Sequence, residues 1–299
     1  MTNHQLRNFF YLFLLSCCWG PSFLFIKIAV EYVGPITLTN IRMIIGGIIL
    51  FTILKINKTQ LPPLGKCWKH FAVMAIFSCG LPFTMFGVGE QYIDSSLAAI
   101  INGTTPLFTL MIAHFTTDND RLTKTKFIGS VIGFSGLFLL VLPSLIGAKA
   151  TIYGILASLS AAISYGIGFV YAKKYIHGFK PLVVPTAQLL LAAIFLLPFS
   201  LIIENPLEIE YVSTGATISI LGLAILGSAC AFVIYYKLIS LTNATYTASA
   251  NYIIPVFGVI LGMIVLDEAM TWNCYIGSIM ILFGVMVANG VINLRRKSS

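Results

Sequence analysis

The chain has 299 residues, of which 58% are hydrophobic and only 9% are charged. A soluble domain carries about 25% charged residues, so this chain cannot cover itself with a surface that water solvates. The composition therefore excludes a soluble globular protein and indicates an integral membrane protein. The formal net charge of +8 does not by itself indicate a nucleic-acid-binding protein, because the basic residues must first be located along the chain.

Ten stretches of the chain are apolar enough to cross a membrane. Each contains a window of about 20 predominantly apolar residues, the length that a helix needs to span the hydrocarbon core. The first continues well past Trp19, which is too long for the apolar region of a signal peptide, so we expect it to be retained. The predicted spans are residues 8–29, 35–54, 69–89, 95–115, 123–142, 152–173, 181–203, 212–236, 243–266 and 272–293.

Lysine and arginine are concentrated in alternate connections between these spans, and acidic residues gather in the opposite ones. The positive-inside rule places the basic connections and both termini in the cytoplasm, with the protein in the cell (inner) membrane. The basic excess is therefore a signal of topology. We expect membrane lipids, and no nucleic acid, as partners. The residues on the basic side are Arg7, Lys55, Lys58, Lys66, Lys69, Arg121, Lys124, Lys126, Lys173, Lys174, Lys180, Lys237, Arg295, Arg296 and Lys297.

No residue pattern indicates a bound metal or cofactor. The six cysteines include no C-x-x-C pair and the four histidines are scattered singly, which argues against a disulfide framework and against a metal centre. The chain also lacks an ATP-binding Walker loop and the spacing of a nucleophile elbow. We therefore predict no metal, no cofactor and no enzymatic activity.

The two halves of the chain repeat each other. Equivalent residues recur at offsets of 146 to 149 over five successive spans, which indicates an internal duplication. Each unit has an odd number of predicted helices, five, so the second starts from the opposite side of the membrane and the repeats are inverted. The predicted units are residues 8–142 and 152–293. Matched positions include Trp19 with Tyr165, Pro35 with Pro181, Gly80 with Gly227, and Asn102 with Asn251.

One interrupted stretch occurs in both the fourth and the ninth predicted helix. Asn102 stands one helical turn before Pro106, and Asn251 one turn before Pro255. Proline has no N–H, so each asparagine keeps an unpaired carbonyl beside a kink. In a membrane such groups persist only where protein or a watered cavity receives them, and matched interruptions in two halves point to a transporter's binding site. The alternative is that both prolines are kinks used only for packing.

The pattern as a whole resembles the EamA-type transporters of the drug/metabolite transporter superfamily. The resemblance is carried by Trp19-Gly20 in the first helix, Arg42 in the second, the proline-interrupted fourth and ninth helices, and Glu268 after the ninth. It covers about residues 8–293. It implies an all-α integral membrane protein whose cavity is lined mainly by helices other than the fifth and tenth. Members carry many classes of small organic metabolite, so the resemblance does not identify the substrate.

Six residues are candidates for substrate binding. Arg42 lies within the second span, where a buried guanidinium needs an acceptor, and it could grip a substrate carboxylate or phosphate. The repeat mates Trp19 and Tyr165 stand beside glycines and could line a cavity. The alternatives are an arginine bonded to kink carbonyls and aromatic side chains that only pack. The candidates are Trp19, Arg42, Asn102, Tyr165, Asn251 and Tyr252.

A possible outer gate is formed by Lys27, Glu90 and Glu268, which lie near span ends on the side with few basic residues. No acidic residue lies deep within a span, so the sequence shows no proton or sodium relay of the usual kind. Facilitated transport or exchange fits better, with a site at Glu90 left open.

These observations lead to one hypothesis and two competitors. The leading hypothesis is a secondary transporter of small organic metabolites, such as amino-acid-like solutes, that works by alternating access between the two repeats. The competitors are an integral-membrane enzyme and a lipid flippase-like or structural membrane protein. The motifs Gly129-x-x-x-Gly133 and Gly258-x-x-x-Gly262 predict close helix packing, either inside the bundle or in a homodimer.

Overall fold

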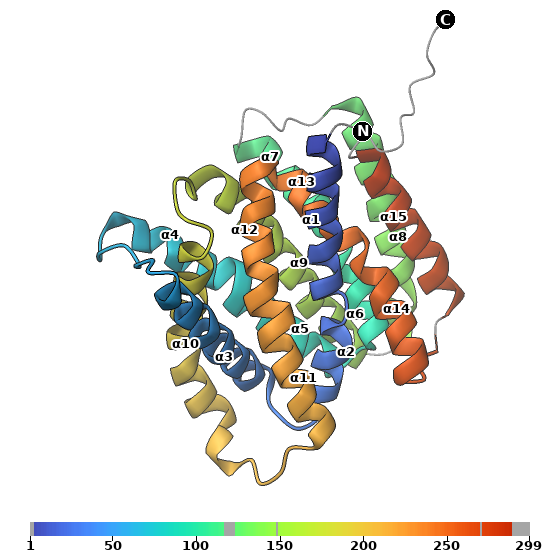
Figure 1. Ribbon diagram of the computed structural model, residues 1–299. Helices are drawn as coiled ribbons and strands as arrows, with labels where there is room; N and C mark the ends of the chain where they lie inside the picture. The colour runs from blue at the N-terminus through green and yellow to red at the C-terminus, as the bar shows by residue number, and fades with distance from the viewer. Residues whose placement is uncertain (1–2, 117–122, 148, 270, 289–299) are drawn as a thin grey trace, which may run out of the picture.

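The computed structural model describes residues 3–116, 123–147, 149–269 and 271–288, and every regular element in these ranges is a helix (Figure 1). The first unit contains α1 (Asn3–Trp19), α2 (Ser22–Ala29), α3 (Pro35–Ile56), α4 (Lys66–Ala75), η1 (Ile76–Gly80), α5 (Leu81–Glu90), α6 (Ser95–Asn102), α7 (Thr105–Thr116) and α8 (Lys124–Gly147). The second contains α9 (Lys149–Tyr175), α10 (Val183–Phe199), η2 (Ser200–Glu204), η3 (Pro206–Glu208), α11 (Thr214–Ala224), η4 (Ile225–Cys230), α12 (Ala231–Leu241), α13 (Ala244–Ala248), η5 (Ser249–Tyr252), α14 (Ile254–Val265) and α15 (Trp272–Ala288).

Eight helical segments of the described residues are long and apolar enough to cross a membrane. They correspond to the predicted spans one to four and six to nine. Helices α8 and α15 occupy the places of the predicted fifth and tenth spans, so the full count of ten crossings stays a prediction. The eight segments are Leu6–Ala29, Pro35–Ile56, Lys66–Glu90, Ser95–Thr116, Ile152–Tyr175, Val183–Glu204, Thr214–Leu241 and Ala244–Val265.

The first span is broken in the middle, where the sequence predicted a continuous helix. α1 ends at Trp19, and α2 begins at Ser22 after a turn formed by Gly20 and Pro21. Proline cannot donate a hydrogen bond to the preceding turn, so the helix stops there. The repeat mate of this turn is continuous within α9, because that stretch has no proline.

The fourth and ninth spans break at the predicted places. α6 ends at Asn102 and α7 starts three residues later, at Thr105, while the ninth span passes through the short 3₁₀ turn η5 before α14. The third and eighth spans carry a second matched feature, the π-helical turns η1 and η4. Such turns are frequent at functional sites in α-helices. Nothing in the apolar pattern predicts them.

Helices pair across the two units. α2 packs on α11 and, in the equivalent arrangement, α9 packs on α5, while α3 pairs with α10, α6 with α14 and α8 with α15. Figure 1 shows α3 beside α10 and α8 beside α15. Each unit therefore covers the other, and the central space is formed by both.

The two glycine motifs are used inside the bundle. A Cβ atom on Gly284 of α15 would lie 2.4 Å from the backbone nitrogen of Gly133 and 2.5 Å from the carbonyl oxygen of Gly129. Only glycine permits such an approach of two helix backbones. A Cβ atom on Gly258 of α14 would likewise lie 2.3 Å from the Cβ of Ala99 in α6. These motifs therefore serve internal packing and carry no argument for a dimer.

The polarity of the bundle matches lipid as the surrounding solvent. Large apolar side chains such as Phe13, Ile202 and Ile264 are exposed, whereas Arg42, Asn102 and other polar groups are buried. A soluble protein shows the reverse pattern. The chain is a multi-pass membrane protein.

Candidate functional site

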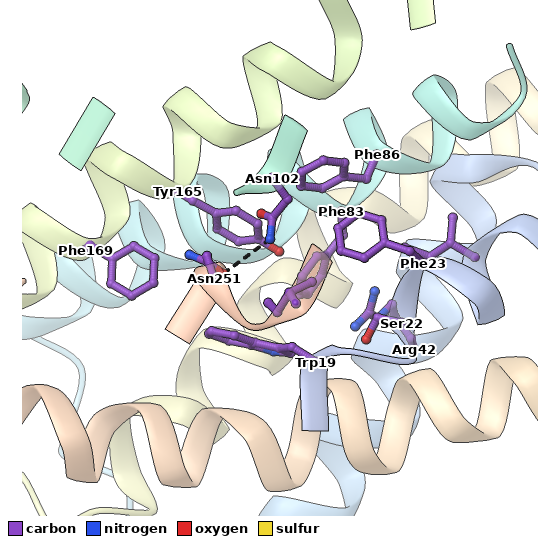
Figure 2. Close-up of a pocket in the computed structure, with 12 residues that line it drawn as sticks. Trp19, Ser22, Phe23, Arg42, Phe83, Phe86, Asn102, Tyr165, Phe169 and Asn251 are labelled. Atoms are coloured by element: carbon purple, nitrogen blue, oxygen red, sulfur yellow. Dashed lines mark hydrogen bonds between the residues drawn. The ribbon is translucent and has the colours of Figure 1, made fainter. Parts of the chain in front are cut away.

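A central cavity lies between the two units. Its volume is about 30 Å³, which holds one or two water molecules and is far below the roughly 300 Å³ or more of a metabolite site. The site is therefore closed in this conformation and has to expand to accept a solute. The lining residues, most of them labelled in Figure 2, are Trp19, Ser22, Phe23, Ile26, Arg42, Phe83, Phe86, Asn102, Tyr165, Phe169, Asn251 and Ile254.

The two interruption asparagines meet in this cavity. The Asn102 Nδ2 donates to Asn251 Oδ1 at 3.3 Å, and Figure 2 shows the two side chains pointing toward each other. Both side chains are almost fully buried, at 1% and 2% exposure. The Nδ2 of Asn251 has no hydrogen-bond partner in the protein. A buried amide donor without a partner is costly, so it is available to an acceptor on a bound solute.

The two breaks contact each other directly. A Cβ on Gly103 would lie only 3.0 Å from Pro255 Cγ, so the two segments approach closely at this glycine. Hydroxyl groups donate hydrogen bonds to two of the backbone carbonyls at the breaks. Thr104 Oγ1 donates to the Ile101 carbonyl at 2.7 Å, and Ser16 Oγ donates to the Ala250 carbonyl at 2.9 Å.

Arg42 projects into the cavity wall from α3 and is 2% exposed. Its Nε donates to Ser228 Oγ at 3.1 Å and its Nη2 to the Gly227 carbonyl at 3.3 Å, both in the π turn η4. Its Cζ lies 3.8 Å from the centre of the Phe83 ring. These partners are neutral, so the positive charge stays available to an anion in the cavity.

The repeat mate of Arg42 forms a neutral network instead. Gln188 Nε2 donates to Cys79 Sγ at 2.8 Å, in the π turn η1, and its Oε1 accepts from the hydroxyl of Tyr236. Each π turn thus receives the polar residue of the opposite unit. Arg42 and Gln188 therefore occupy equivalent positions in the two units, but only Arg42, in the first unit, carries a charge.

The aromatic repeat mates also meet. The rings of Trp19 and Tyr165 are stacked, with centroids 6.5 Å apart and planes at 28°. Trp19 Nε1 donates to the Gly227 carbonyl at 3.1 Å, so this donor is occupied and the indole offers its face. The lining of the cavity does not include Tyr252. That residue lies one position beyond Asn251 in η5, whose tighter turn directs the two neighbours differently.

The three predicted gate residues gather at one end of the bundle. The Lys27 amine donates to the carbonyl oxygens of Glu90 at 2.7 Å and Ile93 at 2.9 Å. The carboxylate of Glu268 accepts from the backbone N–H groups of Ser95 at 2.8 Å and Ser96 at 2.9 Å, and from the hydroxyl of Ser96. Glu268 thereby caps the N-terminus of α6 in the other unit, where a negative charge is favoured.

Sequence reasoning missed a matching cap by Glu204. Its carboxylate accepts from the backbone N–H groups of Ile36 at 3.0 Å and Thr37 at 2.7 Å, at the start of α3. No sequence signal identifies this cap, because Glu204 lies 168 and 167 positions from the residues that it binds. In the structure, α3 and α6 both begin without a side-chain cap from their own preceding residue. Both carboxylates tie the second unit to the first at the same end of the bundle.

Glu268 lies outside the candidate spans, and its pKa is set by two opposing effects. Burial raises the pKa, but the hydrogen bonds from Ser96 and Ser95 outweigh it and leave the pKa below its ordinary value. Glu268 therefore remains ionised near neutral pH. Its contribution to stability is complete above the pKa of an unfolded glutamate and is lost as the pH falls through the lowered pKa.

Glu268→Gln is expected to lower the free energy of unfolding by about 1–2 kcal/mol at neutral pH, since the start of α6 loses a charged acceptor. Thermal unfolding in detergent measures this, and the difference from the unchanged protein should shrink in acid. Glu208→Gln, at an exposed glutamate of the same end, is the matched control. Equal stabilities of the two variants would contradict the capping role.

Both halves of the chain match the model of the EamA-like transporter family, at residues 7–142 and 152–290. The chain is 26% identical over 284 residues to the uncharacterized transporter YoaV of Bacillus subtilis (strain 168), covering 94% of this chain and 96% of that one. It is 25% identical over 290 residues to an uncharacterized transporter of Archaeoglobus fulgidus, covering 94% and 98%. An uncharacterized inner membrane transporter of Escherichia coli (strain K12), YedA, is 27% identical over 252 residues, covering 84% and 80%.

A solved structure described only as a crystal structure of a protein has the same fold. It superposes with a TM-score of 0.71 at 16% identity and covers 95% of this chain and 97% of its own. At this identity the likeness concerns the fold alone.

In the described part of the chain, no group of three or more histidine, cysteine or acidic residues could hold a metal ion.

Proposed function

Because the chain belongs to the EamA-like transporter family, we propose that it is a secondary transporter of small organic metabolites that carry a carboxylate or another anionic group. Membrane transport follows from the family, whose named relatives are transporters rather than enzymes. The observation that carries the substrate class is Arg42, a buried cation in the cavity wall with neutral partners. A solute anion would complete its electrostatic environment.

The other lining groups suit an amino-acid-like solute. The free Nδ2 of Asn251 can donate to a substrate oxygen, and the indole face of Trp19 and the ring of Tyr165 offer apolar contact. The cavity lies where both units contribute helices, so a rocking motion of one unit against the other would expose it to each side in turn. In the present closed conformation it holds no more than one or two water molecules.

Uptake into proteoliposomes tests this function. Radiolabelled amino acids, nucleosides, polyamines and cationic drugs are offered to vesicles with and without the purified protein. We expect saturable uptake of one or more carboxylate-bearing compounds and none of the polyamines. Uptake of cations in preference to anions would contradict the substrate class. Scrambling of a fluorescent lipid without solute uptake would favour a flippase, and chemical alteration of a compound would favour an enzyme.

We further propose that the protein lies in the inner membrane with both termini in the cytoplasm, as the distribution of lysine and arginine favours. The test is cysteine labelling at Lys58, an exposed position in the connection between α3 and α4. In a cysteine-free background, Lys58→Cys in intact cells should not react with an impermeant maleimide, whereas Leu207→Cys at the other end should. Labelling of Lys58→Cys from outside would reverse the topology.

A further inference from the structure

Glu90 is a completely buried acidic residue that the proposed binding site does not use. It is the last residue of α5, its side chain is 0% exposed, and neither carboxylate oxygen has a hydrogen-bond partner in the protein. Its main-chain carbonyl, in contrast, accepts from the Lys27 amine at 2.7 Å. The lysine therefore binds the backbone of Glu90 and not its carboxylate.

The second unit shows what this position requires for packing. The Lys173 amine donates to the carbonyls of Ile239 at 3.2 Å and Thr242 at 2.5 Å, at the end of α12. This is the repeat equivalent of the contact from Lys27, so Ile239 occupies the place of Glu90. Ile239 is buried as well, at 4% exposure. Because an isoleucine suffices there, the helix-end contact does not need a carboxyl group.

The surroundings of Glu90 favour its neutral form. Its charged neighbours are Lys27 from α2 and Glu268 after α14, and Asp94 before α6 interacts with the same two groups. Two of the three donors of Lys27 are taken by carbonyls, while Glu268 is held as an anion by the start of α6. At Gly87 and Gly89, which precede Glu90 on α5, the nearest atoms come from uncharged residues, namely Pro35 of α3 and Gly154 and Ser158 of α9. An ionised carboxylate without partners is strongly disfavoured in such an interior.

We propose that Glu90 is a proton-binding site. It couples closing of the outer end of the bundle, the end that carries Lys27, Glu90 and Glu268, to the binding of one proton. This proposal rests on the proposed transport function and adds its coupling. When the outer end opens, water reaches the carboxylate and the proton leaves to the outer solution. When it closes, a proton from that solution binds one carboxylate oxygen, and the neutral acid is buried.

Infrared spectroscopy of the purified protein in lipid tests the site without any substrate. We expect a C=O stretching band of a protonated carboxylic acid at neutral pH, absent in Glu90→Gln and present in Glu31→Gln, an exposed control at the same end. Glu90→Asp, which keeps an ionisable group, should retain a shifted band. If Glu90 is neutral, Glu90→Gln should also keep the thermal stability of the unchanged protein. A spectrum with carboxylate bands alone would overturn the proposal, as would the same acid band in Glu90→Gln.

Uptake from solutions of different outer pH then tests the coupling, with a compound identified in the proteoliposome screen. Alkaline outer solution should slow uptake, by up to about tenfold per pH unit once the open state loses its proton. Glu90→Gln, permanently neutral, should take up solute at a rate independent of outer pH, while Glu31→Gln should behave like the unchanged protein. Persistence of the pH dependence in Glu90→Gln would overturn the coupling. Absence of uptake of every compound would overturn transport itself, while the infrared band would still decide the proton site.

Discussion

Replacement of Arg42 by glutamine is expected to weaken substrate binding by about 1.5–3 kcal/mol, an increase in Kd of roughly 10- to 150-fold. The guanidinium is the cation of the cavity wall, and its partners Ser228 and Gly227 are neutral. Loss of the charge therefore removes the main attraction for an anionic solute. Binding of the compound found in the uptake screen can be measured by calorimetry on the purified protein.

Two further variants separate binding from folding. Arg42→Lys keeps the charge but loses the planar fork of donors, so it should restore affinity only in part. Arg7→Gln removes an exposed arginine far from the cavity and should leave affinity unchanged. A well-folded Arg42→Gln protein with unchanged affinity would assign Arg42 to structural support of the π turn η4.

Straightening the two interrupted spans is expected to reduce transport by about tenfold, the effect of roughly 1.4 kcal/mol on a rate. Pro106→Ala and Pro255→Ala each supply an N–H that can bond the carbonyl of the asparagine one turn earlier. The continuous helices would pull Asn102 and Asn251 out of their mutual contact at 3.3 Å. Initial rates of uptake by the double variant measure the effect.

The asparagines should respond differently from the prolines. Asn102→Ala or Asn251→Ala should lower substrate affinity by about 0.5–1.5 kcal/mol with less effect on the transport cycle, since one hydrogen bond is lost and the breaks remain. Pro198→Ala, at an exposed proline inside α10, is the control for proline removal. Full transport by the Pro106→Ala, Pro255→Ala double variant would remove the breaks from the mechanism.

The parts of the fold that depend on local chemistry could be predicted from the sequence. Apolar length identified the helices, and the missing N–H of Pro106 and Pro255 located the breaks in the fourth and ninth spans. The internal duplication also predicts contacts between distant residues. Equivalent residues of the two units are related by a twofold axis, so those that lie close to this axis also lie close to each other. That relation accounts for the stacking of Trp19 on Tyr165.

Features that depend on distant partners escaped prediction. The π turns contain no proline, and η4 is held by contacts from Arg42 and Trp19, more than 180 residues away. The cap of α3 by Glu204 joins residues 167 and 168 positions apart. The full burial of Glu90 was also missed, because hydropathy places that residue at the end of a span, where side chains usually reach water.

The pairing of helices across the units has a consequence for biogenesis. The ribosome releases the first unit while the helices that cover α2, α3 and α6, namely α11, α10 and α14, have not yet been made. The first unit is therefore in the bilayer before the second, and during that time its polar side chains, including Arg42, lack their native contacts. Native packing can begin only when the second unit is inserted, so assembly is late and dominated by contacts between distant parts of the sequence. Neither half is a self-sufficient folding unit, although each is a complete repeat.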